Sequence, residues 1–279
     1  MLDAMVQLNC LSFHLFYRKD ADDMLMQCKT FTDQLGKEGL LKDFFFIRYG
    51  EGGPHIRLRL FYEETGETVL IECLQQWVSE CPEILRAEKS AFLPEVERYG
   101  GESCLDPALN LFAASSRAVL QWVERFHPVN AGRRIAQAVK LHFVFLQAMD
   151  CSLVEMQRVL ESFIADWLPM ACLSLGMEAS EGGRLLPLFR AQSQTKQELL
   201  LQLFADLNEQ LEKRCFRDPL LQDYFDETRS RMVYFSGLEQ HKRVTVLSSF
   251  LHMTNNRLGL SNYDEPFVAF LLLKMIANA

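Results

Sequence analysis

Basic side chains recur at every second position in one short segment, at His55, Arg57 and Arg59. Because side chains alternate between the two faces of a β-strand, a strand here would place all three on one face and the apolar residues between them on the other. Guanidinium groups bind carboxylates and phosphates through paired hydrogen bonds, so the pattern indicates an anion-binding surface. Composition alone favours a plainer alternative, a solvated strand face whose arginines form ordinary ion pairs.

A further arginine, Arg98, lies in the segment Pro94–Gly101, which has the sequence PEVERYGG. The glycine pair directly after Tyr99 favours a tight turn, which would fix the direction of the Arg98 side chain. An arginine held in this way is suited to bind a carboxylate. Spacing alone favours the alternative, an ordinary turn in which Arg98 pairs with Glu95 or Glu97.

A third polar cluster occupies the segment His252–Gly259, where His252 and Asn256 are four residues apart and share one face of an expected helix. A histidine changes charge near neutral pH, so His252 is a candidate proton donor or acceptor. Gly259 is expected to end the helix in the left-handed conformation. A helix end that carries His252 and Arg257 for their favourable interaction with the helix dipole explains the cluster equally well.

The elements that must position these residues change character along the chain. The first third alternates strands with helices, and the glycine-rich segment between Tyr49 and His55 predicts a tight turn between two strands. We expect strands at 10–17, 44–49 and 55–60, helices at 21–35 and 67–81, and an extended segment at 83–99. Apolar residues at helical spacing then predict helices near 106–126, 132–148, 152–168, 190–214, 218–235, 239–257 and 264–278.

Local signals place some of the element ends. Asp106-Pro107 predicts an N-cap followed by proline in the first helical turn, and Ser152 with Glu155 resembles a capping box. The segment Gly176–Pro187 is expected to be a loop.

The predicted fold class is α+β, with a small, mostly antiparallel sheet and flanking helices in the N-terminal third, followed by a largely helical C-terminal part. We expect residues 1–279 to form a single domain, with an α/β part at about 1–104 and a helical part at about 105–279.

The composition and motif content argue against several classes of protein. A net charge of -8 argues against a dedicated nucleic-acid-binding protein, whose surface would be basic. The 8 cysteines form no Cys-x-x-Cys pair and the 6 histidines show no zinc-type spacing, so we expect reduced thiols, no metal site and a cytoplasmic protein. No glycine-rich phosphate loop is present, and we expect no cofactor. No segment suits a signal peptide or a membrane span.

Taken in order, the three clusters resemble the C-terminal, glutamate-eliminating domain of class I lantibiotic dehydratases, a domain also found alone as the thiopeptide-type bacteriocin biosynthesis protein. The matching motifs are Phe45–Tyr49, His55–Arg59, Pro94–Gly101, Leu111–Ser116, His252–Arg257 and Glu265. Each motif alone is modest, and the ordered set, which spans nearly the whole chain, carries the specificity. One departure is that family members often carry Asp before the Ser of the helix motif, where this chain has Ala114 and Ser115.

The resemblance implies an activity. Full-length enzymes of that family first glutamylate Ser or Thr of a precursor peptide with glutamyl-tRNA, and the elimination domain then removes glutamate to leave dehydroalanine or dehydrobutyrine. A chain of 279 residues is too short for the glutamylating part, so the resemblance implies a lyase that is the small subunit of a split dehydratase. The implied partners are a precursor peptide with its leader and a larger glutamylating protein that would itself bind the tRNA. No direct tRNA binding and no membrane contact are expected, and a homodimer stays open.

The resemblance also implies the site residues. Arg57, Arg59 and Arg98 would hold the glutamyl carboxylates and stabilise developing negative charge. His252 would take the α-proton or protonate the leaving carboxylate, and which residue is the base stays open. The neighbouring residues expected to bind substrate are Arg48, His55, Tyr99, Asn256 and Arg257.

Two alternatives remain beside elimination. The same fold includes the pyridine synthases of thiopeptide pathways, which join two dehydroalanines in a formal (4+2) cycloaddition and then release the leader peptide. Retention of the three arginines and the histidine favours elimination. The other alternative is a non-catalytic partner that binds a leader peptide along an edge strand.

Overall fold

The computed structural model describes residues 9–63 and 66–277 of the chain. It divides into two compact units, of which the first comprises residues up to Pro94 together with Val119–Pro128, and the second comprises Glu95–Ala118 with Val129–Ala279. The division falls before the predicted boundary near residue 104. The long helix α3 (Glu102–Phe126) contributes residues to both units.

The first unit contains a four-stranded antiparallel sheet with the order β2-β3-β1-β4. Its strands are β1 (Cys10–Tyr17), β2 (Asp43–Tyr49), β3 (His55–Phe61) and β4 (Ile84–Ser90). The three predicted strands and the antiparallel sheet are thereby confirmed, and β4 lies in the segment predicted to be extended. Gly52 and Gly53 turn the chain between β2 and β3 with φ of 76° and 109°, a left-handed conformation that favours glycine.

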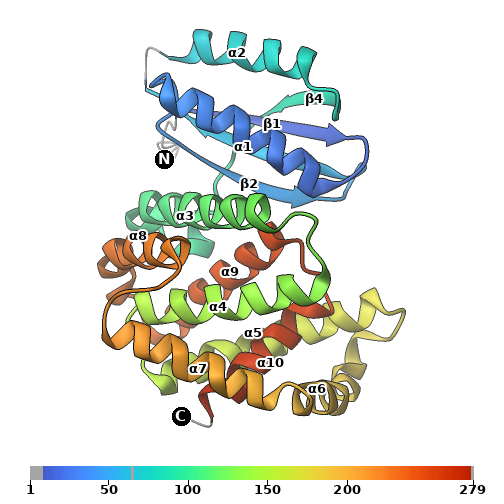
Figure 1. The fold of residues 1–279 in the computed structure, drawn as a ribbon, viewed down its shortest axis with the longest axis vertical. Helices are drawn as coiled ribbons and strands as arrows, with labels where there is room; N and C mark the ends of the chain where they lie inside the picture. Colours follow the sequence, from blue (N-terminus) through green and yellow to red (C-terminus); the bar gives the residue numbers. More distant parts are fainter. Residues whose placement is uncertain (1–8, 64–65, 278–279) are drawn as a thin grey trace, which may run out of the picture. The chain divides into compact units, whose positions relative to one another are not determined.

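The two faces of this sheet differ in chemistry. One face is apolar, with Leu58 fully buried, and is covered by α1 (Ala21–Lys37) and α2 (Glu67–Glu80). In Figure 1, α1 crosses in front of the strands. The two helices also contact each other, because the ring of Phe31 stacks on Trp77 with 4.3 Å between the ring centroids. Alternation along β3 places its basic residues on the opposite face of the sheet.

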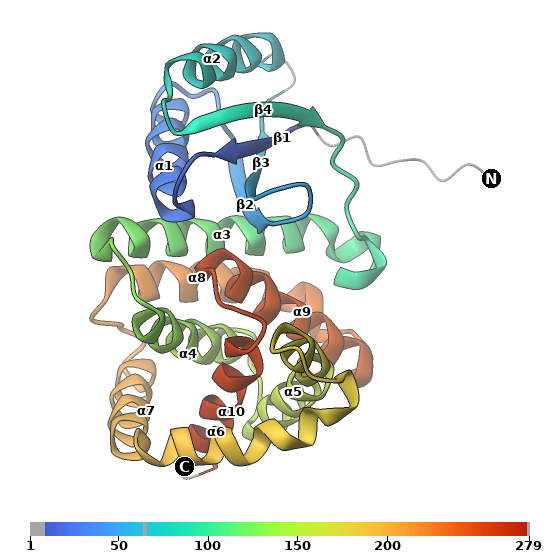
Figure 2. The ribbon, with the colours of Figure 1, turned by 90° about the vertical axis from the view of Figure 1, so that its right-hand side faces the viewer.

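The second unit is helical, which confirms the predicted α+β class. Besides part of α3 and the 3-10 turns η1 (Glu97–Tyr99) and η2 (Ala179–Arg184), it contains α4 (Ala131–Ala148), α5 (Leu153–Ser174), α6 (Leu185–Gln194), α7 (Gln197–Glu212), α8 (Pro219–Ser236), α9 (Gln240–Leu258) and α10 (Asp264–Ile276). Helix α10 is apolar on nearly all sides and packs on α4 and α5 (Figure 2). A helix of this composition belongs in the core, which is where the unit places it.

Two helix ends agree with their sequence signals. The Ser152 hydroxyl accepts the N–H of Glu155 at 3.2 Å and so caps α5. Gly259 ends α9 with φ of 73°, and the N–H of Leu260 reaches the Asn255 carbonyl at 3.1 Å. These are the contacts of a glycine-terminated helix.

Three local predictions were wrong. The single helix expected at 190–214 is two helices, α6 and α7, which are separated at residues 195–196. Helix α3 starts at Glu102 rather than at Asp106, because Gly100 and Gly101, with φ of 108° and 98°, already reverse the chain there. Pro107 therefore lies inside the helix, where its ring removes one backbone hydrogen bond. The expected loop at 176–187 instead contains η2 and the start of α6.

No single helix in the described part of the chain is long and apolar enough to cross a membrane. Leu153–Ser174 and Ala179–Gln194 satisfy that test only as a pair, bent by 105°.

Candidate active site

On the basic face of the sheet, His55 holds Arg57 in a fixed direction. The buried imidazole of His55 donates from Nδ1 to the Gly53 carbonyl at 2.8 Å, which leaves Nε2 to accept a hydrogen bond. Nε of Arg57 donates to that Nε2 at 3.3 Å, and the Arg57 guanidinium lies 3.3 Å from the centre of the Tyr49 ring. The remaining guanidinium N–H groups of Arg57 are thereby oriented by protein contacts, as an anion-binding arginine requires.

The next arginine of the strand, Arg59, is buried without acceptors. It is 6% exposed, and its guanidinium lies 6.0 Å from the Phe45 ring and 5.6 Å from the Phe92 ring. Among the residues that the structure describes, none accepts a hydrogen bond from its Nε or Nη1. Burial, and then the charge of Arg57, lowers the pKa of Arg59 to about 10. Buried donors of this kind are costly unless an acceptor binds them, so Arg59 is suited to an anionic ligand.

Sequence reasoning missed His14, which extends the same face. The register of β1 and β3 sets His14 opposite Arg57, and its ring stacks on His55 with 4.8 Å between centroids. Burial, followed by the charge of Arg57, lowers the pKa of His14. The alternating pattern of β1 was the available signal, because it places His14 on the same face as Ser12.

The structure does not bring Arg48 together with these residues. Its neighbour across the hairpin is Ile56, so Arg48 points to the face that α1 covers. There Nη2 of Arg48 lies 2.5 Å from the buried carboxylate of Asp22 in the first turn of α1. This ion pair gives Arg48 a structural contact with α1, away from the basic face.

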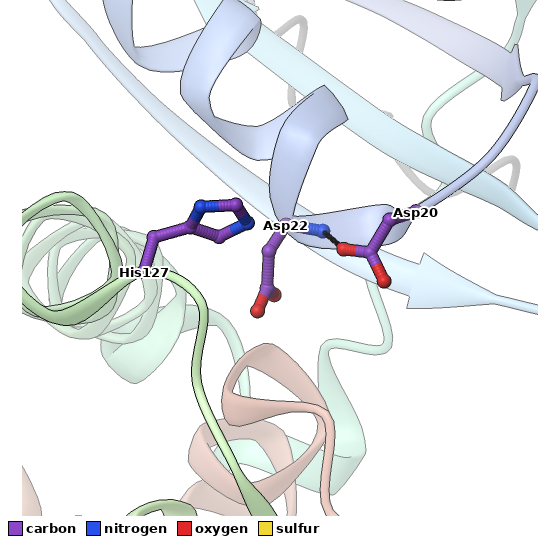
Figure 3. A group of neighbouring side chains, drawn as sticks. All are labelled: Asp20, Asp22 and His127. Atoms are coloured by element: carbon purple, nitrogen blue, oxygen red, sulfur yellow. Dashed lines mark hydrogen bonds between the residues drawn. The ribbon is translucent and has the colours of Figure 1, made fainter.

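A group of three side chains in the first unit has the composition of a metal site. Ligand atoms of Asp20, Asp22 and His127 lie within 4.8 Å of one another (Figure 3). Asp20 caps α1 by accepting the N–H of Asp22 at 2.7 Å, and Asp22 pairs with Arg48. Nε2 of His127 lies 3.3 Å from Asp23. The N-terminus of a helix also carries partial positive charge, which disfavours a cation. A helix cap, the Arg48–Asp22 ion pair and the contact between His127 and Asp23 account for the group.

In the second unit, Arg98 lies in η1 with its side chain 40% exposed. Nη1 pairs with Glu95 at 3.1 Å, the contact that spacing favours, and Nε donates to the Ser249 hydroxyl at 3.3 Å. The backbone turn after it requires Gly100, because a Cβ there would lie 2.9 Å from the Cys104 sulfur. Arg98 is thus anchored on one side and open to solvent on the other.

Tyr99 and Arg257 are buried in the core of the second unit. Tyr99 packs edge-on against Phe112 at 4.8 Å, and burial raises its pKa to about 12. Arg257 is fully buried, with its guanidinium 5.0 Å from the Phe112 ring, and burial lowers its pKa to about 10. Asn256, by contrast, is half-buried, like His252 one turn before it. Because they are buried, Tyr99 and Arg257 have a structural role in the packing around α9.

His252 is held on two sides by residues of other helices. Its Nδ1 lies 2.9 Å from Oε2 of Glu265 at the start of α10, and its ring stacks on Trp167 of α5 at 4.1 Å. No described residue forms a hydrogen bond with Nε2. Sequence analysis missed Trp167 and noted Glu265 only as part of a motif. Neither contact has a local sequence signal, because both depend on how three helices pack.

A buried chain of hydrogen bonds continues behind Glu265. Nδ2 of Asn255 donates to the same Oε2 at 3.3 Å, and Oδ1 of Asn255 lies 2.7 Å from Nε2 of His142. Burial raises the pKa of Glu265, while the contacts with His252 and Asn255 act against that rise. Burial lowers the pKa of His142 to about 4, so this imidazole is neutral near pH 7.

The sequence-predicted residues therefore form two groups. The first unit contains Arg48, His55, Arg57 and Arg59, and the second contains Arg98, Tyr99, His252, Asn256 and Arg257.

Comparison with known proteins points to one family. The family model described as lantibiotic biosynthesis dehydratase C-term matches residues 11–276. The epidermin biosynthesis protein EpiB of Staphylococcus epidermidis is 23% identical over 263 residues, which cover 92% of this chain and 25% of EpiB. The subtilin biosynthesis protein SpaB of Bacillus subtilis is 29% identical over 122 residues, which cover 42% of this chain and 12% of SpaB. The chain thus spans a quarter or less of the length of these relatives.

Solved structures share the fold at low sequence identity. The tRNA-dependent lantibiotic dehydratase MibB from Microbispora sp. 107891 matches with a TM-score of 0.65 and 19% identity over 97% of this chain and 28% of MibB. The pyridine synthase TbtD, from thiomuracin biosynthesis, matches with a TM-score of 0.66 and 14% identity over 97% of this chain and 98% of TbtD. TsrL matches with a TM-score of 0.61 and 13% identity over 98% of this chain and 95% of TsrL.

Proposed function

Because the chain belongs to the lantibiotic biosynthesis dehydratase C-terminal family, we propose that it removes glutamate from glutamylated Ser or Thr residues of a ribosomally made precursor peptide. The products are dehydroalanine and dehydrobutyrine. In this proposal the chain is the small subunit of a split dehydratase in the cytoplasm, and a larger protein glutamylates the peptide from glutamyl-tRNA.

The basic face of the first unit carries the proposal. Arg59 has buried N–H donors that no described residue accepts, and Arg57 is oriented beside it. A glutamyl ester offers its one free carboxylate to such donors, and its ester group becomes a second carboxylate as it leaves. Hydrogen bonds to these groups are strongest when partly shielded from water. Two dehydroalanines, the reacting groups of a cycloaddition, have no carboxylate to offer.

The proposed reaction is a β-elimination in which every group has a role. A base takes the α-proton, the electron pair of that bond forms the Cα=Cβ double bond, and the Cβ–O bond breaks to release glutamate as a carboxylate. Arg57 and Arg59 bind the free carboxylate of the glutamyl group and the carboxylate that forms as glutamate leaves, and Arg98 stabilises the negative charge that develops on the peptide carbonyl. His252 transfers the proton.

One observation favours a second candidate, a pyridine synthase. The match covers 98% of TbtD, a pyridine synthase of this length, but only 28% of MibB. Similarity at 14% identity indicates a shared fold only. One fold can host several activities, so the residues of the site have to distinguish elimination from cycloaddition.

The test is mass spectrometry of a glutamylated precursor peptide incubated with this protein alone. Stepwise loss of glutamate, abolished in His252→Ala and Arg98→Ala, is the expected result. An unchanged mass, with folded protein and bound peptide, contradicts elimination. A multiply dehydrated peptide is then the next substrate, because its cyclisation with release of the leader identifies a pyridine synthase.

A further inference from the structure

Two contacts fix the imidazole of His252 in one orientation. The ring lies flat against Trp167, with an interplanar angle of 23°, so it cannot rotate freely about its last side-chain bond. Nδ1 faces Oε2 of Glu265 at 2.9 Å, and the Glu265 side chain is 3% exposed. The opposite ring nitrogen, Nε2, belongs to a side chain that is 21% exposed and therefore accessible.

The residues behind Glu265 determine which of its neighbours donate. His142 is neutral, and its Nε2–H donates to Oδ1 of Asn255. That contact turns the amide so that Nδ2 of Asn255 points to Glu265 and donates to Oε2. Asn255 is fully buried, which prevents its amide from turning to solvent. A hydrogen-bond donor on Oε2 stabilises the ionised form of Glu265, which can then accept only.

We infer that Glu265 is a positioning residue that keeps the proton of neutral His252 on Nδ1, so that Nε2 carries the lone pair and is the base that takes the α-proton. The inference rests on the proposed elimination for its chemical meaning. In the reaction Nε2 gains the α-proton, and the resulting imidazolium is stabilised by the Glu265 carboxylate through Nδ1–H. The leaving glutamate departs as a carboxylate and needs no proton from His252.

Two substitutions of Glu265 distinguish its role in positioning the His252 proton from a role in packing alone. Glu265→Met removes the acceptor at similar length, and Glu265→Gln keeps the shape and an acceptor oxygen but removes the charge. Asp264→Asn is the matched control, because Asp264 carries the same charge one position earlier and contacts Ser261 instead. We expect kcat to fall about 10- to 100-fold in Glu265→Met, a part of the ~10²–10⁴-fold that a general base contributes, with KM unchanged. Glu265→Gln should recover part of kcat, and Asp264→Asn should retain all of it.

A spectroscopic measurement tests the same inference without any turnover. Nitrogen-15 NMR of the imidazole side chains, with the His252 signals assigned by their loss in His252→Gln, reports which ring nitrogen carries the proton. We expect the Nδ1–H form in the wild-type protein and a mixture of both forms in Glu265→Met. An Nε2–H form in the wild type, or unchanged populations and kcat in a folded Glu265→Met, overturns the inference. Wild-type protein that shows the Nδ1–H form but does not release glutamate contradicts the proposed elimination instead.

Discussion

On the basic sheet face of the first unit, Arg59 is almost completely buried, and two of its nitrogens have no acceptor among the described residues. In the second unit, Glu265 is also almost completely buried, but its carboxylate accepts hydrogen bonds from two side chains. Unmet buried donors lower the stability of a fold unless a ligand binds them, whereas a satisfied network holds its members in place. Under the proposed function, this difference means that the first region receives a group from outside, whereas the second orients a group of its own.

The largest effect is expected from His252→Ala in the oriented region. Turnover of a glutamylated peptide should fall about 10²–10⁴-fold, since this is what a general acid or base contributes. Binding of the peptide should persist, because the anion-binding arginines are intact. His241→Ala is the matched control, since His241 is on the same helix with its side chain 82% exposed. Mass spectrometry for turnover and fluorescence anisotropy for binding separate the two, and loss of binding in His252→Ala would contradict the division of roles.

Arg59→Met tests the receiving region, with opposite expected effects on turnover and stability. Turnover should fall about 10²–10³-fold, the usual cost of one preorganised donor to a developing charge. The free energy of unfolding should rise by roughly 1–3 kcal/mol, because the buried donors without acceptors are removed. Urea unfolding measures the second effect. Arg18→Met, at an exposed arginine of the same unit, provides the control, and a less stable Arg59→Met protein would show that Arg59 is a structural residue.

Arg257 sharpens the comparison because burial lowers its pKa to about 10, as for Arg59, yet its surroundings differ. It lies fully buried beside Phe112, with the hydroxyl groups of Tyr99 and Tyr224 close enough to act on its charge. Arg257→Ala should therefore lower the free energy of unfolding by about 2–4 kcal/mol through the cavity it leaves. Urea unfolding of Arg59→Met and Arg257→Ala side by side should give changes of opposite sign. An Arg257→Ala protein as stable as the wild type would contradict a structural role of Arg257 in the core of the second unit.

The sequence could predict features that depend on local periodicity. Alternation along β3 correctly placed His55, Arg57 and Arg59 on one face, because a strand has a fixed period of two. The same rule, carried across the hairpin, places Arg48 on the opposite face, so its separation from Arg57 was available from the sequence. Gly259 was predictable as well, since its left-handed conformation is a local requirement.

Other features depend on packing between distant segments and had no local signal. Glu265 meets His252 only because α9 and α10 turn at Gly259 and pack with α5, and Trp167 comes from that third helix. The predicted loop at 176–187 folds as η2 because Gly182 packs on Leu168 of α5, where a Cβ would come within 3.0 Å. The glycine-rich composition of this segment predicts a flexible loop, but packing against the neighbouring helix α5 determines its structure.

The smallest expected effect concerns pH and the histidine behind the oriented region. Burial lowers the pKa of His142 from an ordinary 6.5 to about 4, so between these values the unfolded chain binds a proton that the native state does not. Stability should therefore be constant above about pH 6.5 and fall as the pH drops toward 4, by at most about 3 kcal/mol at 1.36 kcal/mol per pKa unit. His142→Gln, which is neutral throughout, should lack this part of the slope in urea unfolding, while His241→Gln should keep it. An identical slope in His142→Gln would mean that burial does not lower the pKa of His142, because the native and unfolded states would then bind its proton over the same pH range.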